Sequence, residues 1–326
     1  MMRSPLSSLF WVLLLFIFGA TAPASVSAQE REWPSRPVAI VNLFGPGGNG
    51  DVASRAVAQA LTNKFGQSFI VENRPGGGGV VGSTFVAKAP PDGYTLITTA
   101  IGPAVLNQLL FKSVPYDTER DFTPIIMLGE VPNVIVSSPQ LGFKTLQDLV
   151  AYGKSNPAGL NIGHSGAGSM GHLTAALFAA KAGVKATFVA YRSPGAVVTD
   201  VLGGQIHAGV PTFIPAVQSV TALAVTGNQR LEFQPNIPTI RESGLDVVAI
   251  TWIAILAPAG LPDKIRDQIN AAVNDYLKSN EGREAFAKLN VMAVGGTPEQ
   301  LAQTIKRDRE LWAPIIAKEN IQLDAN

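Results

Sequence analysis

Apolar runs of strand length alternate with helical patterns from Val38 to about Leu256. The clearest unit begins with the apolar run Val38 to Phe44, continues through the glycine-rich segment Gly45 to Gly50, and enters a helical repeat that Gly66 ends. Alternation of this kind is typical of βαβ units, so we predict a largely parallel sheet. Asp51 stands at the start of the helical repeat, and we predict that it is the N-cap.

The same order begins again in the second half of the chain. Thr145 with Asp148 predicts the start of a helix by the capping-box rule. A strand near Leu160 to Gly163 then leads into a second glycine-rich turn, Gly163 to Gly171. This recurrence predicts two α/β lobes of similar size that face one another across a central ligand cleft.

The apolar pattern also predicts how the chain divides between the lobes. We assign residues 29–128 and 254–298 to lobe 1 and residues 129–253 to lobe 2, with a C-terminal helix at 299–326 packing on lobe 2. The segments Ile125 to Val136 and Val247 to Leu256 are long apolar stretches that can cross between the lobes. We expect them to act as hinges.

The N-terminus predicts export. Arg3 precedes an apolar run from Leu9 to Ala20, and the small residues of Val26-Ser27-Ala28 follow. This order is that of a secretory signal peptide at residues 1–28, cleaved after Ala28, and it predicts a periplasmic protein. The alternative is an uncleaved membrane anchor, but the apolar run is short for a span of roughly 20 residues.

Composition excludes several classes of function. The chain of 326 residues has no cysteine, so it can form neither a disulfide framework nor a thiolate metal site. The formal charge is +1 and no cluster of basic residues occurs, so nucleic acid is not an expected partner. The three histidines, His164, His172 and His207, have no tight acidic cluster beside them, so we predict no metal site.

The two glycine-rich turns carry the chemistry. Each leads from a strand to a helix N-terminus, where unpaired N–H groups and the helix dipole favour an anion. The second turn, His164 to Ser169, contains no acid and adds hydroxyl and imidazole donors, so it is the better carboxylate site. The plainer alternative is that both loops contain glycine because the backbone needs positive φ.

Two rival functions can be weighed on the same residues. Gly45, Gly47 and Gly50, with Glu72 after the next strand, have the spacing of a dinucleotide fingerprint. Asp51 at the helix start, the proline in the loop and the predicted export argue against it. A hydrolase would need a serine, a base and an orienting group in a recognisable constellation, and none is present. We therefore predict no enzyme and no cofactor.

Six ordered motifs then carry a family resemblance over nearly the whole exported chain. They are Trp33-Pro34-Ser35-Arg36-Pro37, Phe44-Gly45-Pro46-Gly47-Gly48-Asn49-Gly50-Asp51, Val71-Glu72-Asn73-Arg74-Pro75-Gly76, Ala89-Pro90-Pro91-Asp92-Gly93-Tyr94-Thr95-Leu96, Leu223-Ala224-Val225-Thr226 and Leu256-Ala257-Pro258-Ala259-Gly260. Together they resemble the receptors of tripartite tricarboxylate transporters, the Bug (TctC) family. The resemblance implies a Venus-flytrap, type II-like periplasmic binding protein. It would capture an organic carboxylate and deliver it to a permease of one large and one small subunit. We expect a monomer, and the alternative function is a sensor that presents its carboxylate to a membrane signalling protein.

The resemblance also implies which residues bind the ligand. The candidates are Phe44, Gly45, Pro46, Gly47, Gly48, Asn49, Asp51, Thr99, Ile101, His164, Ser165, Gly166, Ala167, Gly168, Ser169, Arg192 and Thr212. Asp51 is better explained as a loop organiser than as an anion contact. The stretch from His207 to Phe213 lacks the aspartate usual near its start in this family, which argues against an amino acid ligand. Our hypothesis is that Arg192 pairs with the second carboxylate of a dicarboxylate.

Overall fold

The computed structural model describes residues 32–231 and 233–323, so the predicted signal peptide at residues 1–28 lies outside the described part. From Trp33 onward the chain forms one compact unit. Among the helices of these ranges, none combines the length and the apolar character needed to span a bilayer.

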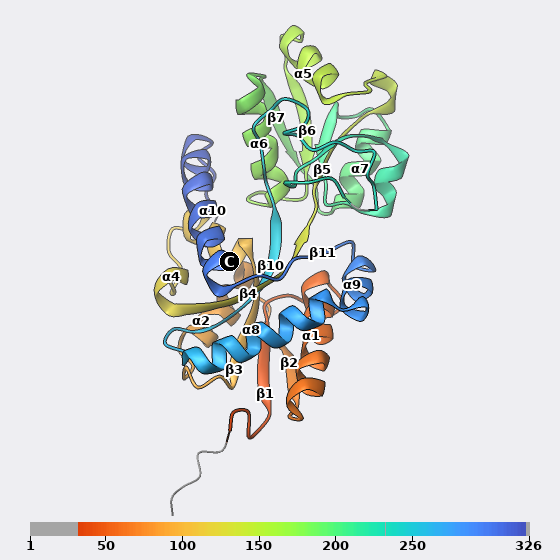
Figure 1. Cartoon of the computed structure of the whole chain (residues 1–326). Helices are drawn as coiled ribbons and strands as arrows, with labels where there is room; N and C mark the ends of the chain where they lie inside the picture. The colour runs from red at the N-terminus through yellow and green to blue at the C-terminus, as the bar shows by residue number, and fades with distance from the viewer. Residues whose placement is uncertain (1–31, 232, 324–326) are drawn as a thin grey trace, which may run out of the picture. The chain divides into compact units, whose positions relative to one another are not determined.

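The first sheet has six strands in the order β11-β4-β10-β3-β1-β2 (Figure 1). Its strands are β1 (Val38–Asn42), β2 (Phe69–Asn73), β3 (Thr95–Ala100), β4 (Phe122–Val131), β10 (Thr251–Pro258) and β11 (Met292–Ala293). Strand β1 is parallel to its neighbours β2 and β3, whereas β10 is antiparallel to both β3 and β4. The helices associated with this sheet are α1 (Asn49–Phe65), α2 (Val80–Ala87), α8 (Asp263–Lys278) and α9 (Asn280–Ala287).

The second sheet has five strands in the order β7-β6-β8-β5-β9. These are β5 (Val134–Ser137), β6 (Leu160–His164), β7 (Ala186–Ala190), β8 (Ala208–Val210) and β9 (Thr221–Val225). Here β6 is parallel to β7 and β8, and β5 is antiparallel to its neighbours. Figure 1 shows α5 (Leu146–Ser155), α6 (Met170–Ala182) and α7 (Pro194–Leu202) grouped around this sheet.

Both sheets are mixed, so the prediction of a largely parallel sheet is wrong. The error has a physical source, because β4, β5 and β10 are mainly apolar, and an apolar segment does not reveal strand direction. Two α/β sheets, each with its own helices, are nevertheless present as predicted. Only Pro132 and Asn133 separate β4 in the first sheet from β5 in the second. The Asn133 side chain donates to Thr251 Oγ1 at 3.1 Å, so it joins this crossing to the start of β10.

Helix ends follow local chemistry, with one correction. Gly66 ends α1 in the left-handed conformation, and Thr145 with Asp148 forms the predicted capping box of α5. Asp51 is not the N-cap of α1, because Gly48 occupies that position and Asp51 lies within the first helical turn. A glycine at the N-cap supplies no side-chain acceptor, so the aspartate is free to bond elsewhere.

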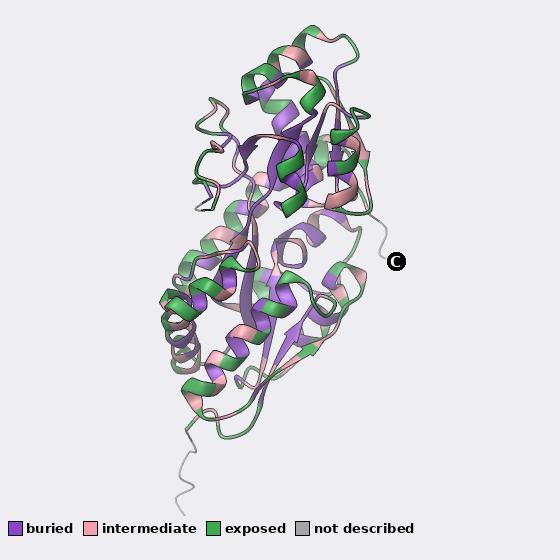
Figure 2. Cartoon of the chain, turned by 90° about the vertical axis from the view of Figure 1, so that its right-hand side faces the viewer, coloured by how far each residue is buried: buried purple, intermediate pink, exposed green. Residues whose placement is uncertain are grey.

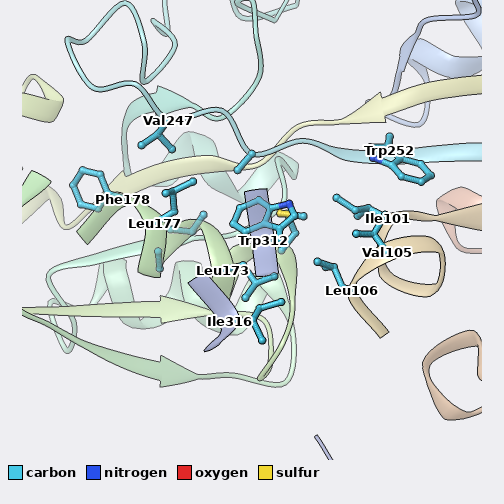
Figure 3. Close-up of a cluster of buried hydrophobic side chains, with 14 of the residues drawn as sticks. Ile101, Val105, Leu106, Leu173, Leu177, Phe178, Val247, Trp252, Trp312 and Ile316 are labelled. Atoms are coloured by element: carbon cyan, nitrogen blue, oxygen red, sulfur yellow. The ribbon is translucent and has the colours of Figure 1, made fainter. Parts of the chain in front are cut away.

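The C-terminal helix α10 (Pro298–Lys318) contacts elements of both sheets. It packs on β4, on the π-helical segment Gly102–Leu106, on α3 (Asn107–Leu110) and on α6. Figure 3 shows Trp312 of α10 among side chains of α6 and of the segment that leads from β3 into α3. The lobe boundaries predicted above stay a prediction.

A buried indole and carboxyl join α10 to the sheet. Trp252 and Trp312 are 0% and 1% exposed, and the Trp252 Nε1–H donates to Asp308 Oδ2 at 2.8 Å. Burial raises the pKa of Asp308, while the Trp252 bond and Arg307 oppose that rise. Figure 2 shows where burial occurs along the chain: the strands are mostly buried, whereas the outer faces of the helices are exposed.

We expect Trp312→Ala to destabilise the protein by about 3–5 kcal/mol, because it opens a cavity in a core that both sheets share. Urea unfolding followed by circular dichroism measures the change. Leu202→Ala is the matched control, since Leu202 is 45% exposed and should change the free energy of unfolding by less than about 0.5 kcal/mol. Equal stability of the two variants would contradict the role given to Trp312.

Candidate functional site

The first glycine-rich turn joins the carboxyl end of β1 to the N-terminus of α1. Residues Gly45 to Asn49 are exposed, whereas Gly50 is buried beneath Phe44. Gly47 has φ of +82°, which any other residue would adopt only with strain. Apart from Pro46 and Asn49, the turn therefore presents backbone without side chains to solvent, which allows an anion to approach N–H groups.

The Asp51 carboxylate fixes this turn by hydrogen bonds and an ion pair. The Gly47 N–H donates to Asp51 Oδ2 at 2.9 Å, and Asn73 Nδ2 donates to Asp51 Oδ1 at 2.8 Å. Arg55, one helical turn further on, pairs with the same carboxylate at 3.0 Å. Asp51 is 3% exposed, so its carboxylate organises the turn and is not a surface group.

Two asparagines extend this network. Asn42 Nδ2 and Asn73 Nδ2 each donate to the Phe44 carbonyl at 2.9 Å. These asparagines and Arg55 were missed in the sequence analysis. A polar residue at the last position of each of two neighbouring apolar strands was the signal that could have found them.

Thr99 and Ile101 lie on the neighbouring part of the first sheet. Thr99 is on β3, Ile101 follows its end, and both are about 2% exposed. In the same register Asn42 faces Thr98, and the buried Asn42 Oδ1 and Thr98 Oγ1 have no hydrogen-bond partner among the described residues. The carboxyl end of this sheet therefore combines exposed amides with buried polar atoms.

The second turn joins β6 to α6. Ser169 is the N-cap of α6, and its Oγ accepts from the His172 N–H at 3.2 Å. Gly168 has φ of +71°, and a Cβ there would lie 2.7 Å from Leu323 Cδ1. Ser165 Oγ is buried with no partner in the described chain. As in the first turn, the backbone can be approached closely because side chains are absent where it bends.

Two histidines flank the second turn. The rings of His164 and His172 stack with centroids 4.1 Å apart and an interplanar angle of 9°. His164 is 2% exposed, and its Nδ1 lies 2.8 Å from the Gly166 carbonyl. The Gly168 N–H donates to His172 Nδ1 at 3.2 Å. Burial lowers the pKa of His164, and burial with the neighbouring His164 lowers the pKa of His172 to about 4.

Arg192 and Thr212 lie near the second turn in the fold. Arg192 is exposed and follows β7, where the Tyr191 N–H donates to the His164 carbonyl at 2.8 Å. Thr212 follows β8, which pairs with β6 at His164, and it forms an isolated bridge with Asn133. The structure thus gathers the predicted site residues into two groups, one at the carboxyl end of each sheet's parallel strands.

Neither rival chemistry gains support from the geometry. Glu72 pairs with the adjacent Arg74 at 3.1 Å, and the buried negative charge of Asp51 stands where a pyrophosphate would enter. No histidine ring nitrogen forms a hydrogen bond with a serine hydroxyl in the described chain: His164 Nδ1 bonds to a carbonyl, and His172 Nδ1 and His207 Nδ1 accept from backbone amides. In residues 32–231 and 233–323 no group of three or more acidic, histidine or cysteine residues is arranged to hold a metal.

Grooves elsewhere on the molecule do not involve these residues. One of about 260 Å³ runs beside α10, where Leu177, Arg307 and Trp312 are among the lining residues. It contains none of the predicted site residues. The predicted site residues lie in and beside the two turns and not in this groove.

Two α/β sheets with crossing strands, each with a glycine-rich turn at a helix N-terminus, define the class of two-lobed solute-binding receptors. The family model described as the tripartite tricarboxylate transporter family receptor, TctC, matches residues 53–321. The chain therefore belongs to the TctC family of solute-binding receptors, as the sequence motifs predicted.

Similar proteins agree with this membership. Protein BugT of Bordetella pertussis is 34% identical over 314 residues, covering 94% of this chain and 96% of BugT. The structure of Rpa4515 from R. palustris with adipate is 32% identical, has a TM-score of 0.72, and covers 87% of this chain and 97% of that one. MatC from Rhodopseudomonas palustris with bound malate is 29% identical, with a TM-score of 0.69 and coverage of 87% and 99%.

We expect Asp51→Asn to lower the free energy of unfolding at pH 7 by on the order of 1–2 kcal/mol, allowing for the half-exposed Arg55. The Arg55 bond holds the pKa of Asp51 at about 2, below its ordinary 3.8. This stabilisation is therefore complete above about pH 4 and is lost as the pH falls towards 2.

Urea unfolding at several pH values tests this expectation. The difference between wild type and Asp51→Asn should shrink below pH 4. Asp246→Asn is the control, because Asp246 is 79% exposed in its pair with Arg241 and should have an effect below about 0.5 kcal/mol. A wild-type acid profile identical to that of Asp51→Asn would contradict the assignment.

Proposed function

We propose that this protein captures an organic dicarboxylate outside the cytoplasm and delivers it to a membrane permease of one large and one small subunit. In this proposal, residues 1–28 are removed on export to the periplasm. The mature chain acts as a monomer with the two lobes predicted from the sequence. One carboxylate binds at the first turn and the other at the second.

One observation carries this proposal above the others. In both sheets the chain leaves a parallel strand, passes through a glycine-rich turn and enters a helix whose first amides have no partner within the helix. Such amides and the helix dipole favour carboxylate groups. Rpa4515 with adipate and MatC with malate, both relatives in fold and sequence, support a carboxylate as the ligand.

Two sites for anions on separate lobes favour a ligand with two carboxylates. A ligand that bridges both turns binds the closed arrangement better than the open one, and closure follows from that difference in affinity. The crossing at Pro132 and Asn133, beside Thr251, is short enough to act as the hinge. Recognition of the closed form by the permease would then couple capture to transport.

Arg192 supports a second charge on the ligand. The residue is exposed in the loop after β7, and the Tyr191 N–H to His164 carbonyl bond ties this loop to the second turn. An arginine can grip a carboxylate with two parallel hydrogen bonds. We assign to Arg192 the carboxylate that the second turn receives.

We expect adipate or a similar dicarboxylate to raise the melting temperature and to bind with a Kd at or below the micromolar range. Hexanoate, which has the same chain length and one carboxylate, should bind at least tenfold more weakly, since a charged hydrogen bond contributes about 1.5–3 kcal/mol. Thermal shift followed by isothermal titration calorimetry gives both values. Amino acids and nucleotides complete the screen, and a shift with nucleotides alone would overturn the proposal.

Arg192→Ala should weaken dicarboxylate binding about tenfold, because one charge-assisted contact is lost. Lys185→Ala is the matched control, since Lys185 is an exposed base just before the opposite end of β7. Calorimetry of both variants makes the comparison. Unchanged dicarboxylate affinity in Arg192→Ala would remove this residue from the site.

A further inference from the structure

The two turns share the same spacing of glycines in the sequence. Gly45, Gly47 and Gly50 precede Asp51, and Gly166, Gly168 and Gly171 precede His172 at the same intervals. Asp51 and His172 are each the third residue of their helix. The two residues therefore occupy equivalent positions in the two lobes.

Each of these residues accepts the same backbone bond. The amide four residues earlier donates to it, Gly47 to Asp51 Oδ2 at 2.9 Å and Gly168 to His172 Nδ1 at 3.2 Å. A glycine-rich turn has no side chains of its own to pack, so an anchor at this position fixes its path. In the first lobe the anchor is a carboxylate paired with Arg55, while in the second it is an imidazole with Ala176 at the arginine's position.

The hydrogen bonds define the protonation of both histidines. The Gly166 carbonyl can only accept, so His164 Nδ1 carries a proton. The Gly168 N–H can only donate, so His172 Nδ1 carries none. The His172 ring is therefore neutral with its proton on Nε2, and burial, which lowers the pKa of His164, favours the neutral Nδ1–H tautomer there. Stacking on His164 and an edge contact with Phe188 at 5.5 Å keep the His172 ring in place.

The charged groups around His172 are few. The strands β6, β7 and β8, which α6 contacts, contain no acidic or basic residue, and His164 is their titratable group. From α10, Arg307 and Asp308 face α6 near Leu177 and Lys181, and Lys181 lies about 13 Å along the helix from His172 at the usual rise per residue. The low pKa of His172 agrees with a neutral ring at neutral pH.

Hydrogen bonds within the second turn determine which of its amides are available to a ligand. The Gly168 N–H is bound to His172, and the Ser169 N–H donates to the Gly166 carbonyl at 3.2 Å. Among the described residues, the Gly166 and Ala167 amides have no backbone acceptor. These two amides lie beside Ser165, whose buried hydroxyl also has no partner in the described chain.

We propose that His172 is the positioning residue of the second turn and the uncharged counterpart of Asp51. It fixes the turn so that the Gly166 and Ala167 amides and the Ser165 hydroxyl receive a carboxylate, and it does so without placing a negative charge beside that carboxylate. This inference rests on the proposed function for the ligand, but the anchoring of Gly168 can be tested without one.

Three substitutions separate anchoring from charge. His172→Leu removes the acceptor at similar volume, His172→Asn keeps an acceptor near the Nδ1 position, and His172→Asp copies the first lobe without its arginine. By calorimetry with adipate, the Leu variant should bind about tenfold more weakly than wild type and the Asn variant within about threefold. The Asp variant should bind at least about tenfold more weakly, although its turn stays anchored, because like charges repel.

Exchange of the Gly168 amide, measured by NMR in the ligand-free protein, supplies the second readout. It should be slow in wild type, Asn and Asp variants and at least about tenfold faster in the Leu variant, which lacks the bond. Nitrogen shifts of the wild-type imidazoles should show opposite tautomers for His164 and His172. The nitrogen shifts are measured on the wild-type protein, so they test the hydrogen bond at His172 even if the Leu variant does not fold.

His207, which lies just before β8, provides a matched control because it bonds near the start of β6, at the end away from the second turn. Its Nδ1 accepts from the Asn161 N–H at 2.8 Å, so His207→Leu removes an equivalent bond away from the turn. This variant should lose stability and keep the adipate affinity of wild type.

Protonation of His172 removes the acceptor at Nδ1, so the adipate affinity of wild type should fall relative to that of His172→Asn as the pH approaches about 4. The protonation of adipate itself affects both proteins equally and cancels in the ratio of the two affinities.

The outcomes distinguish failure of the proposed carboxylate binding from failure of the anchoring role of His172. Wild type that binds no carboxylate would end the proposed function, while the exchange data would still judge the anchor. Equal Gly168 exchange in wild type, Asn and Leu variants would overturn the anchor. Equal loss of affinity in the Leu and Asn variants would reduce His172 to packing, and an Asp variant that binds like wild type would show that the missing charge is irrelevant.

Discussion

A glycine-rich turn has few side chains to pack, so its backbone has to be held by hydrogen bonds from neighbouring residues. In both lobes the third residue of the following helix meets this need by accepting the amide of a glycine four residues earlier. Asp51 is in turn fixed by Arg55 and Asn73, and His172 by its stacking on His164. These two hydrogen bonds restrain the course of the two turns, while the loop that contains Arg192 is tied to the second turn by the Tyr191 N–H to His164 carbonyl bond.

Much of this arrangement could be predicted from the sequence. Glycine clusters between an apolar strand and a helical repeat identified both turns, and Gly66 and the Thr145–Asp148 pair identified helix ends, because these signals are local. Strand direction could not be predicted for β4, β5 and β10, since an apolar run buried on both faces has no period to read. The roles of Asn73 and His172 depend on pairing across the sheet and on ring stacking, which are not local.

Asp51 shows that a local sequence rule can give the wrong helix cap. An aspartate at a helix start is commonly a cap, and the prediction followed that rule. In the structure Gly48 is the cap, and the carboxylate turns back to Gly47 instead. The expectation that Asp51 organises the loop accompanied the family resemblance, whereas the atom that it bonds depended on where the chain turned.

The core that α10 shares with both sheets has a consequence for engineering. Trp312 and Ile316 pack in one cluster with α6 and with the segment around Ile101 and Val105, so the lobes are not independent cassettes (Figure 3). A chimaera that exchanged one lobe for that of a relative would bring a foreign surface against α10. To build a biosensor with a new ligand range, it is therefore safer to recombine the two turns and their anchoring residues, and to leave the helix and everything it touches in a single parental background.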